Sequence, residues 1–354
     1  MNRLHAKLLK IGNDPKATAK TVGLRYLSDR AKGFTRYRAG DGFKYRDPEG
    51  KIVRDKQLLQ RFAKLVIPPA WENVWISPVE HGHLQVTGTD TKGRKQYRYH
   101  PEWNDIRNQS KFFRLRRFAD ALPKIRSRVE KDLALPGLPY EKVLALVVKL
   151  IETTNIRIGN DAYKKLYGSF GLTTLRDRHV KFDRATVWFE FTGKKGVKHK
   201  IALQSARLAK LVQRCKDIPG QDLFQYYDDD GTHRCIGSGD VNAYIKEISG
   251  EDFSAKDFRC WSGSVQALCA FQDIGAFKSD TECKKKIVAV VDFVAEKLGN
   301  TRSVCKKYYV HPAVIASYEN RNIGRYACQT CDDSVSLNGN EKALVALLDE
   351  AIDN

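Results

Sequence analysis

The sequence predicts an α+β protein in which a small β-rich region, residues 1–108, precedes a larger and mostly helical region, residues 109–354. Two patterns indicate this division. Before about residue 105, short runs of β-branched and aromatic residues alternate with turn residues. After it, apolar residues recur at helical spacing. A chain of 354 residues has the length of about two or three domains.

The β-rich region contains strand patterns with one helix pattern between them. Residues 43–46 and 51–53 flank a turn over 47–50 and predict strand, turn, strand. A short helix is expected over 58–65, because Pro68 and Pro69 end any helix that precedes them. Further strands are expected over 84–88 and 96–99.

The larger region is predicted to be helical apart from one β-hairpin near 186–203. A long helix is expected where apolar residues recur at alternating steps of three and four, namely Leu115, Phe118, Leu122, Ile125, Val129 and Leu133. Further helical stripes occupy 143–151, 208–215, 287–298 and 344–352. In the hairpin, Val187, Phe189 and Phe191 alternate with Trp188, Glu190 and Thr192. Trp188 and Phe271 are assigned to the core.

The net charge of the chain points to a polyanionic partner. Lysine and arginine number 62 and aspartate and glutamate 42, which leaves a net charge of +20. Such an excess attracts nucleic acid, because neutralising phosphates releases counterions. An anionic membrane surface is the weaker alternative. The longest apolar run, 143–151, contains Lys149 and is too short to span a bilayer.

The eight cysteines are scattered, and no secretory leader is recognised, so reduced thiols in the cytoplasm are expected. Cys328 and Cys331 form one C-x-x-C pair. A zinc site needs a second pair or two histidines at ligand spacing, so the pair is interpreted as incidental. No metal or other cofactor is expected.

The segment 298–312 is the strongest candidate for chemistry. It places Asn300 nine positions before Tyr309, and Lys306 and Lys307 lie just before that tyrosine. A tyrosine can attack a phosphate when cations stabilise its phenolate, since a free phenol has a pKa of about 10. A solvated basic turn with packed aromatics is the alternative interpretation of this segment.

Cleaving a phosphodiester without metal also requires fixed cations and a proton donor. Arginine binds phosphate oxygens bidentately and stays charged, and lysine can donate a proton to the leaving oxygen. Arg157, Lys194 and Arg259 lie in otherwise apolar segments, with Arg259 placed before a helix start. Each alone is also consistent with an ordinary solvated charge at the end of an element.

Four segments together resemble type IB DNA topoisomerases of the compact bacterial and poxvirus group. They are Ile156-Arg-Ile-Gly, Phe191-Thr-Gly-Lys194, Lys256-Asp-Phe-Arg-Cys-Trp and Leu298-Gly-Asn-Thr with Tyr309, in the family's order and intervals. The segments 67–75 and 87–103 also resemble the bacterial members. The resemblance covers about residues 20–325. It implies a clamp of two domains, whose catalytic domain is similar to that of tyrosine recombinases.

The resemblance implies a role for each catalytic candidate. Tyr309 would form a 3′-phosphotyrosyl bond, Arg157 and Arg259 would hold the phosphate oxygens, and Lys194 would protonate the 5′-oxygen. Asn300 stands where the family often has histidine; it can still donate a hydrogen bond. Supercoils of either sign would relax without ATP or a required metal.

The resemblance also implies contacts to duplex DNA. The expected DNA-binding residues are Gln96, Tyr97, Tyr99, Arg94, Lys95, Tyr163 and Lys256. An amphipathic surface strand is the alternative for the residues of 94–99.

Two other functions remain open on the sequence: a site-specific tyrosine recombinase and a non-catalytic architectural DNA-binding protein. Here Lys256-x-x-Arg259 replaces the recombinase His-x-x-Arg pattern, which argues against the first. We expect a monomer in the cytoplasm, associated with chromosomal DNA, and no membrane partner.

Overall fold

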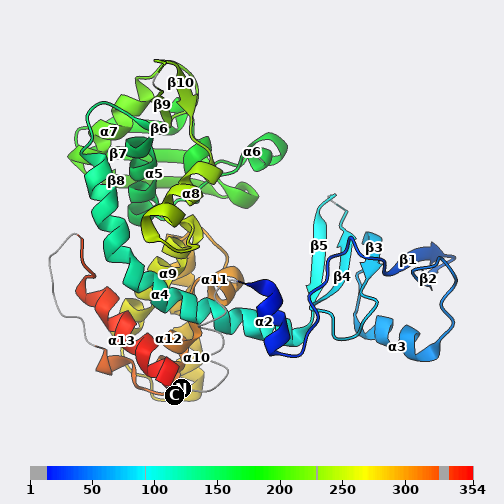
Figure 1. Ribbon diagram of the computed structural model, residues 1–354. Coiled ribbons are helices and arrows are strands. Elements are labelled where there is room, and N and C mark those ends of the chain that lie inside the picture. The colour runs from blue at the N-terminus through cyan, green and yellow to red at the C-terminus, as the bar shows by residue number, and fades with distance from the viewer. Residues whose placement is uncertain (1–13, 92, 229, 327–334, 354) are drawn as a thin grey trace. The chain divides into compact units, whose positions relative to one another are not determined.

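A computed structural model describes residues 14–91, 93–228, 230–326 and 335–353 (Figure 1). The chain divides into two compact units, Met1–Phe113 and Arg114–Asn354, which we call the N-terminal and C-terminal units. The division falls inside one long helix, α4 (Pro101–Leu133), which also contains the domain boundary predicted at 108/109. The α+β class is confirmed, since a small sheet unit precedes a larger helical one.

The N-terminal unit is built on an antiparallel sheet. In its described part, five strands lie in the order β2-β1-β3-β4-β5. The elements are α2 (Pro15–Thr21), β1 (Phe34–Ala39), β2 (Gly42–Arg46), α3 (Lys56–Lys64), β3 (Glu72–Ile76), β4 (Leu84–Thr89) and β5 (Lys95–Tyr99). Helix α3 begins at the N-cap Asp55 and packs on the sheet through Phe62, which is 1% exposed.

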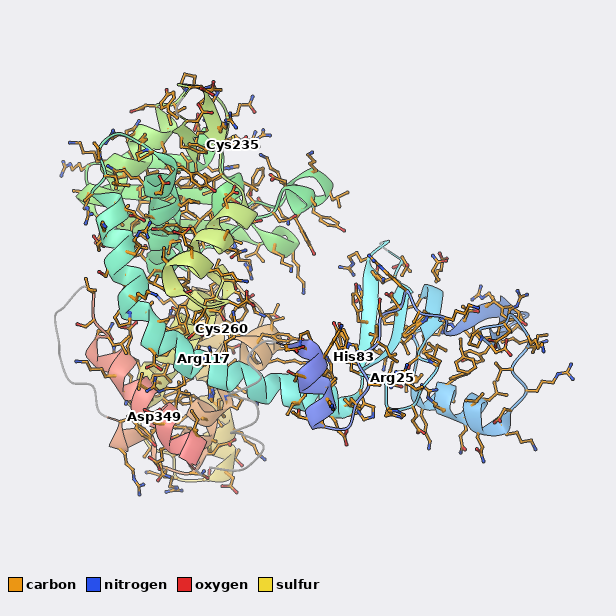
Figure 2. The ribbon with its side chains drawn as sticks, viewed as in Figure 1. Arg25, His83, Arg117, Cys235, Cys260 and Asp349 are labelled. Atoms are coloured by element: carbon orange, nitrogen blue, oxygen red, sulfur yellow. The ribbon has the colours of Figure 1, made fainter. Side chains whose placement is uncertain are left out.

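The segment before β1 is tied to this unit by backbone bonds. The Arg25 N–H donates to the His81 carbonyl at 2.9 Å, and the His83 N–H donates to the Arg25 carbonyl at 2.9 Å. Arg25 and His83 accordingly lie side by side in Figure 2. These two bonds hold the segment around Arg25 against the loop that connects β3 and β4.

Of the strand, turn and strand predicted over 43–53, the first strand and the turn are present, and the second strand is reduced to one antiparallel bridge. Strand β2 pairs with β1, and beyond the 47–50 turn only an isolated bridge joins Arg46 to Ile52. The reason is the two-residue turn Gly40-Asp41, because Gly40 has φ +59, a conformation that glycine adopts freely at the start of such a hairpin turn.

The C-terminal unit is mainly helical. Its helices are the rest of α4, then α5 (Tyr140–Thr154), α6 (Asp161–Tyr167), α7 (Ala206–Lys216), α8 (Ser238–Ser249), α9 (Ala255–Ile274), α10 (Asp280–Lys297), α11 (Arg302–Tyr308), α12 (Pro312–Glu319) and α13 (Gly339–Asp353). Short 3-10 turns cover Leu172–Thr174, Asp177–His179, Lys194–Gly196 and Ile323–Arg325. The core is one continuous cluster in which α5 and α9 are central, and both helices contact each other.

The predicted hairpin forms two strands of a larger sheet. In the described residues, β6 (Val180–Asp183), β7 (Thr186–Thr192) and β8 (Lys198–Gln204) pair antiparallel, and β9 (Gln225–Tyr227) and β10 (His233–Cys235) form a separate ribbon. Strand β7 buries Val187, Phe189 and Phe191, as its alternation predicts. Trp188 lies on the opposite, half-exposed face under the Lys200 ammonium, so its assignment to the core was wrong, whereas Phe271 is fully buried.

Helix α13 lies beside α12 at the lower end of the C-terminal unit in the view of Figure 1. Its apolar face buries Leu344, Leu347 and Leu348 against α9 and α12. Its first turn carries Glu341, which is 5% exposed and joins α13 to two other helices through Arg126 and Trp261.

No helix in the described ranges is long and apolar enough to cross a membrane. The same ranges contain no cluster of three or more histidine, cysteine or acidic side chains that could hold a metal. Cys328 and Cys331 lie outside the described residues. Among the described cysteines, Cys215, Cys235, Cys283 and Cys305 are free thiols; Cys235 is exposed at the β9–β10 ribbon, and Cys260 lies on α9 (Figure 2).

Candidate active site

The end of α10 positions Asn300. The Gly299 N–H donates to the Glu296 carbonyl at 3.0 Å, and the Asn300 N–H donates to the Ala295 carbonyl at 2.8 Å. This is the Schellman pattern of helix termination, which needs a left-handed residue just after the helix. Gly299 has φ +58 and meets that need, so the Leu-Gly-Asn sequence itself fixes the turn.

The end of α5 positions Arg157 in a similar way. Asn155 caps the helix in the left-handed region with φ 56, and its N–H donates to the Ile151 carbonyl at 3.0 Å. Beyond it, the Arg157 carbonyl accepts from the Leu172 N–H at 2.8 Å. The two backbones approach so closely that a Cβ on Gly171 would lie 2.5 Å from the Arg157 carbonyl oxygen. The main chain that carries Arg157 is therefore held on both sides.

Arg259 bridges these two helix ends. It lies within α9, in the second turn, so the placement before a helix start was wrong. The side chain is buried, with the residue 3% exposed, and its guanidinium donates to the Leu298 carbonyl at 2.8 Å and to the Asn155 carbonyl. Carbonyls at helix C-termini carry partial negative charge, which stabilises a cation placed there.

No carboxylate pairs with Arg259 among the residues that the structure describes. Burial lowers the pKa of Arg259, and the positive charge of Arg157 lowers it further, whereas Tyr309 acts in the opposite direction. Arginine nonetheless stays protonated in proteins, so the site holds an uncompensated positive charge.

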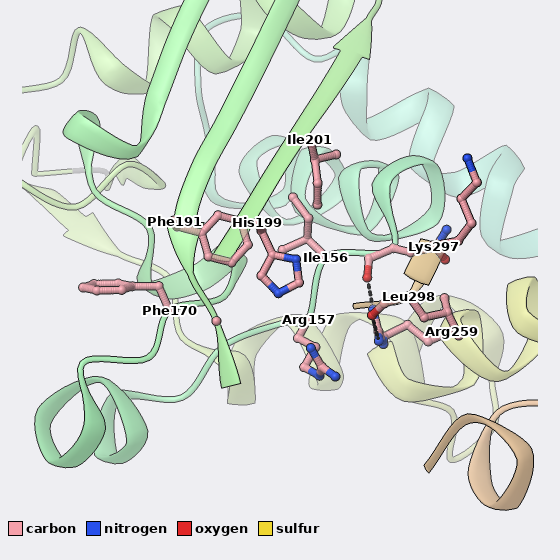
Figure 3. A pocket seen from close by; sticks show the side chains of 11 residues that line it. Ile156, Arg157, Phe170, Phe191, His199, Ile201, Arg259, Lys297 and Leu298 are labelled. Carbon is pink, nitrogen blue, oxygen red and sulfur yellow. Dashed lines mark hydrogen bonds between the residues drawn. The ribbon is translucent and has the colours of Figure 1, made fainter. Parts of the chain in front are cut away.

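Arg157 faces the same pocket as Arg259. Its guanidinium donates to the Gly299 carbonyl at 3.0 Å and to the Asn300 side-chain oxygen. Both arginines line one pocket, together with His199 and Lys297 (Figure 3). The structure thus brings three predicted residues together: Arg157, Arg259 and Asn300.

Tyr309 joins this group through Arg259. The Arg259 Cζ lies 5.2 Å from the centroid of the Tyr309 ring. The backbone at Tyr309 is held by α9, because the Ser264 hydroxyl donates to the Tyr309 carbonyl at 3.2 Å and Gly263 leaves room for the chain. The tyrosine and Arg259 are therefore positioned by the same helix.

The cations near Tyr309 are not those that the sequence suggested. Lys306 and Lys307 are exposed, and the Lys307 ammonium lies over the ring of the neighbouring Tyr308 at 5.3 Å. A seven-residue helix, α11, turns these lysines away, and the buried Arg259 faces the reactive candidate instead.

Lys194 lies apart from the arginine pair. It occupies the tip of the β7–β8 hairpin, where Lys195 has φ +64 and Gly196 has φ +77. The Lys194 ammonium lies 5.4 Å from the centroid of the Tyr163 ring, and within the described residues it forms no hydrogen bond or ion pair. The neighbouring Gly193 does line the arginine pocket, so the hairpin tip is at the edge of the site.

Sequence reasoning missed two residues of this pocket, His199 and Lys297. His199 lies on β8, stacked on Phe191 with ring centroids 4.9 Å apart. Burial lowers the pKa of His199, and the charges of Arg157 and Arg259 lower it further. Its only sequence signal is a single histidine in a basic strand. Lys297 is the last residue of α10, three positions before Asn300.

The DNA-binding candidates of the N-terminal unit are divided between the two faces of β5. Tyr97 and Tyr99 stack with ring centroids 6.1 Å apart, and Gln96 points to the other face, where its amide donates to Asp90 at 2.8 Å. Arg94 also pairs with Asp90, at 2.7 Å, and Lys95 pairs with Asp29. Lys95 lies on the same face as the tyrosines, with its ammonium 5.8 Å from the centroid of the Tyr97 ring, whereas Gln96 and Arg94 meet at Asp90.

The remaining two candidates belong to the C-terminal unit. Tyr163 is 46% exposed on α6, a helix with no buried residue, and it meets Tyr167 at 5.6 Å between ring centroids. Lys256 is exposed in the first turn of α9, one turn before Arg259.

Comparisons with known proteins agree on one family. The model of the catalytic core of eukaryotic DNA topoisomerase I matches residues 100–331, and the model of the bacterial DNA topoisomerase IB N-terminal domain matches residues 42–90. The chain is 31% identical to DNA topoisomerase 1B of Acanthamoeba polyphaga mimivirus over 296 residues, which are 82% of this chain and 88% of the relative. It is 23% identical to DNA topoisomerase 1B of Vaccinia virus (strain Copenhagen) over 280 residues, 78% of this chain and 84% of the relative. It is 24% identical to DNA topoisomerase 1 of Rabbit fibroma virus (strain Kasza), covering 77% of this chain and 88% of the relative.

Proposed function

We infer the reaction mechanism of this chain from the fact that it belongs to the type IB DNA topoisomerase family. It is an ATP-independent DNA topoisomerase, which cleaves one strand of duplex DNA, lets the strand rotate and rejoins it. The roles of its residues follow from the site geometry and are proposals.

Tyr309 is the nucleophile. Its phenol oxygen gives up its proton to solvent and forms a bond to a backbone phosphorus, the bond from phosphorus to the 5′-oxygen breaks, and a 3′-phosphotyrosyl link remains. The observation that carries this assignment is the contact of one buried cation with the tyrosine: Arg259 Cζ lies 5.2 Å from the ring. A fixed positive charge beside the attacking oxygen stabilises the negative charge that develops as the bond to phosphorus forms.

Arg157 and Arg259 hold the phosphate. Both guanidinium groups line one pocket and are fixed by backbone carbonyls rather than by carboxylates. Their charge is therefore not cancelled before DNA arrives. Preorganised donors of this kind stabilise the negative charge that builds on phosphate oxygens in the transition state, at no cost of rearrangement.

Asn300 orients Arg157 and offers a hydrogen bond to the phosphate. Its side-chain oxygen accepts from Arg157, so its amide nitrogen is the group that remains to donate. That nitrogen lies 3.5 Å from the Leu298 carbonyl, a long bond that a phosphate oxygen can replace.

Lys194 is the general acid. When the bond to the 5′-oxygen breaks, the Lys194 ammonium gives its proton to that oxygen, and in rejoining the DNA end returns the proton. Its present contact with the Tyr163 ring, at 5.4 Å, means that its side chain must turn from α6 toward the phosphate when DNA binds. The long, flexible stem of lysine permits such a turn.

The other partners follow from the DNA substrate. We assign phosphate or base contacts to the exposed face of β5 with Tyr97 and Tyr99, and to Tyr163 and Lys256. Gln96, Arg94 and Lys95 can contribute once DNA phosphates compete for their acidic partners Asp90 and Asp29. We place a monomer in the cytoplasm, on chromosomal DNA, with residues 1–108 as the DNA-clamp domain and 109–354 as the catalytic domain.

The deciding experiment traps the covalent complex. Duplex DNA whose cleaved strand is short beyond the cleavage site, so that the released segment dissociates, should yield a protein–DNA adduct. Mass spectrometry should locate the link between Tyr309 and the 3′-phosphate end of the strand that stays bound. Tyr309→Phe should lose the adduct and plasmid relaxation while retaining DNA binding. Tyr308→Phe is the matched control, because Tyr308 is the exposed neighbour on the same helix and should behave as the native protein. An adduct at any other residue would disprove the assignment.

A further inference from the structure

His199 lies between two glycines that flank predicted catalytic residues. A Cβ built on Gly193, the residue before Lys194, would lie 2.6 Å from His199 Nε2. A Cβ built on Gly299, the residue before Asn300, would lie 2.2 Å from His199 Cε1. Both distances are far below any real contact, so the imidazole ring occupies the space that a side chain at either position would need.

The ring is held in this place by packing. It stacks on Phe191, its cross-strand partner on β7, with planes 22° apart. Its two nitrogens have no hydrogen-bond partner among the residues that the structure describes. Figure 3 shows the ring pointing into the pocket beside Arg157. The ring therefore interacts with its surroundings through van der Waals packing rather than through hydrogen bonds.

We propose that His199 is a positioning residue, which sets the spacing between the hairpin tip that carries Lys194 and the turn that carries Asn300. This inference rests on the proposed roles of those two residues. The ring contacts both backbones, because Gly193 approaches it from the hairpin and Gly299 approaches it from the end of α10. Moving the ring would change where the proton donor stands relative to the phosphate.

The charges around the ring support this role. The charged groups that face it are the guanidinium groups of Arg157, from the segment after α5, and of Arg259, from α9. Burial, and then these two charges, hold the pKa of His199 below its usual value, so the ring is neutral at neutral pH. A neutral ring avoids repulsion with the two guanidinium groups, so it can stay packed beside them and act through its shape.

The two glycines provide a matched pair of tests. Gly193 has φ −93, which any residue adopts, so only the His199 ring excludes a side chain there. Gly299 has φ +58, which favours glycine whatever the space. Removing the ring should therefore make room for alanine at 193 but should leave alanine at 299 strained.

The experiment measures single-turnover cleavage with a normal substrate and with one whose 5′-bridging oxygen is replaced by sulfur, a leaving group that needs no proton. His199→Ala should cleave the normal substrate about 10²-fold more slowly, the cost of a small misplacement of a catalytic group. It should recover most of that loss on the sulfur substrate, as Lys194→Ala should. His233→Ala, which alters an exposed histidine on β10, is the control.

A double-variant cycle completes the test. Gly193→Ala should cleave slowly alone, and the double variant Gly193→Ala/His199→Ala should be no slower than either single variant. The double variant Gly299→Ala/His199→Ala should be slower than either of its single variants, because the strain at 299 remains. A native rate for His199→Ala, no recovery on the sulfur substrate, or full additivity of Gly193→Ala would each overturn the inference. Should His199→Ala fail to fold, Gly193→Ala with the two substrates gives the same decision. If the native protein makes no adduct at Tyr309, the proposed function itself fails, which is a different result.

Discussion

Replacing Glu341 should destabilise the C-terminal unit without touching the reaction site. This carboxylate is almost fully buried and accepts four N–H groups. Two come from Arg126 at 2.7 and 2.9 Å, one from the Trp261 indole at 2.8 Å and one from the Asn338 backbone at 3.0 Å. Trp261 lies two positions after Arg259 on α9, so this network also supports the helix that carries the buried arginine.

The expected loss in the free energy of unfolding depends on which partners Arg126 retains after the substitution. After Glu341→Ala, Arg126 still pairs with Glu152 at 2.6 Å and donates to the Ser336 carbonyl at 2.8 Å. Breaking a buried ion pair costs about 3–5 kcal/mol, and the surviving partners put this case near the lower value, about 3 kcal/mol. For a unit of this size, that corresponds to a melting temperature about 6–12 °C lower.

The pH dependence of this loss gives a second check. Burial is the largest single effect and acts to raise the pKa of Glu341, but the hydrogen bonds and charge of Arg126, together with the bonds from Trp261 and Asn338, outweigh it, so the folded pKa is below the ordinary 4.5. A carboxyl with a lowered pKa stabilises the fold above its unfolded pKa. The contribution is therefore full at pH 7 and is lost as the pH falls through the lowered folded value.

Urea unfolding of the full chain at several pH values tests both statements. Glu341→Ala and Glu341→Gln should be less stable than the native protein at pH 7, and the difference should shrink below pH of about 4.5. Glu296→Ala, at an exposed position on α10, should stay within about 0.5 kcal/mol of the native protein. A loss under 1 kcal/mol for Glu341→Ala, or one independent of pH, would refute the reasoning.

Three further predictions concern the reaction and DNA binding. Lys194→Ala should slow cleavage about 10²–10⁴-fold, as expected for a lost general acid, and the sulfur-substituted substrate should restore the rate; a loss without that recovery would exclude Lys194 as the acid. Arg259→Lys should slow cleavage about 10²–10³-fold, because one ammonium cannot keep the Asn155 and Leu298 carbonyls and the phosphate satisfied together; single-turnover rates near the native value would contradict this. The affinity of the native protein for duplex DNA should fall steeply between 50 and 200 mM salt, by about 10³-fold if six phosphates are neutralised, and a flat salt dependence in filter binding would argue against a phosphate-dominated interface.

Much of the site was predictable because it lies where regular elements end. Apolar periodicity located α5 and α10, and Asn155–Arg157 and Gly299–Asn300 follow directly after them. The resemblance to the family, which the comparisons confirm, then selected the arginines from many basic residues. The fold brings four residues close together: Arg157, Arg259, Asn300 and Tyr309. In the sequence, only the order and intervals of the segments that carry them suggested this proximity.

Other parts could not be predicted, for physical reasons. Helix α6 buries no residue, so it has no apolar stripe to detect. Strand β6 is four residues long, and its partner in the sheet determines it more than its composition does. His199 is defined by space left at Gly193 and Gly299, and such steric complementarity between distant positions leaves no mark on any single segment.

The anchoring of Arg259 by the Asn155 and Leu298 carbonyls has a consequence for how this centre can diverge. Every amino acid brings a main-chain oxygen, so the bond to the guanidinium does not itself require the side chains of Asn155 or Leu298; it requires that the chain follow the same path. What evolution must preserve there is the course of two helix ends. A substitution that unwinds either terminus would therefore injure catalysis more than one that merely changes the side chain contributing the oxygen.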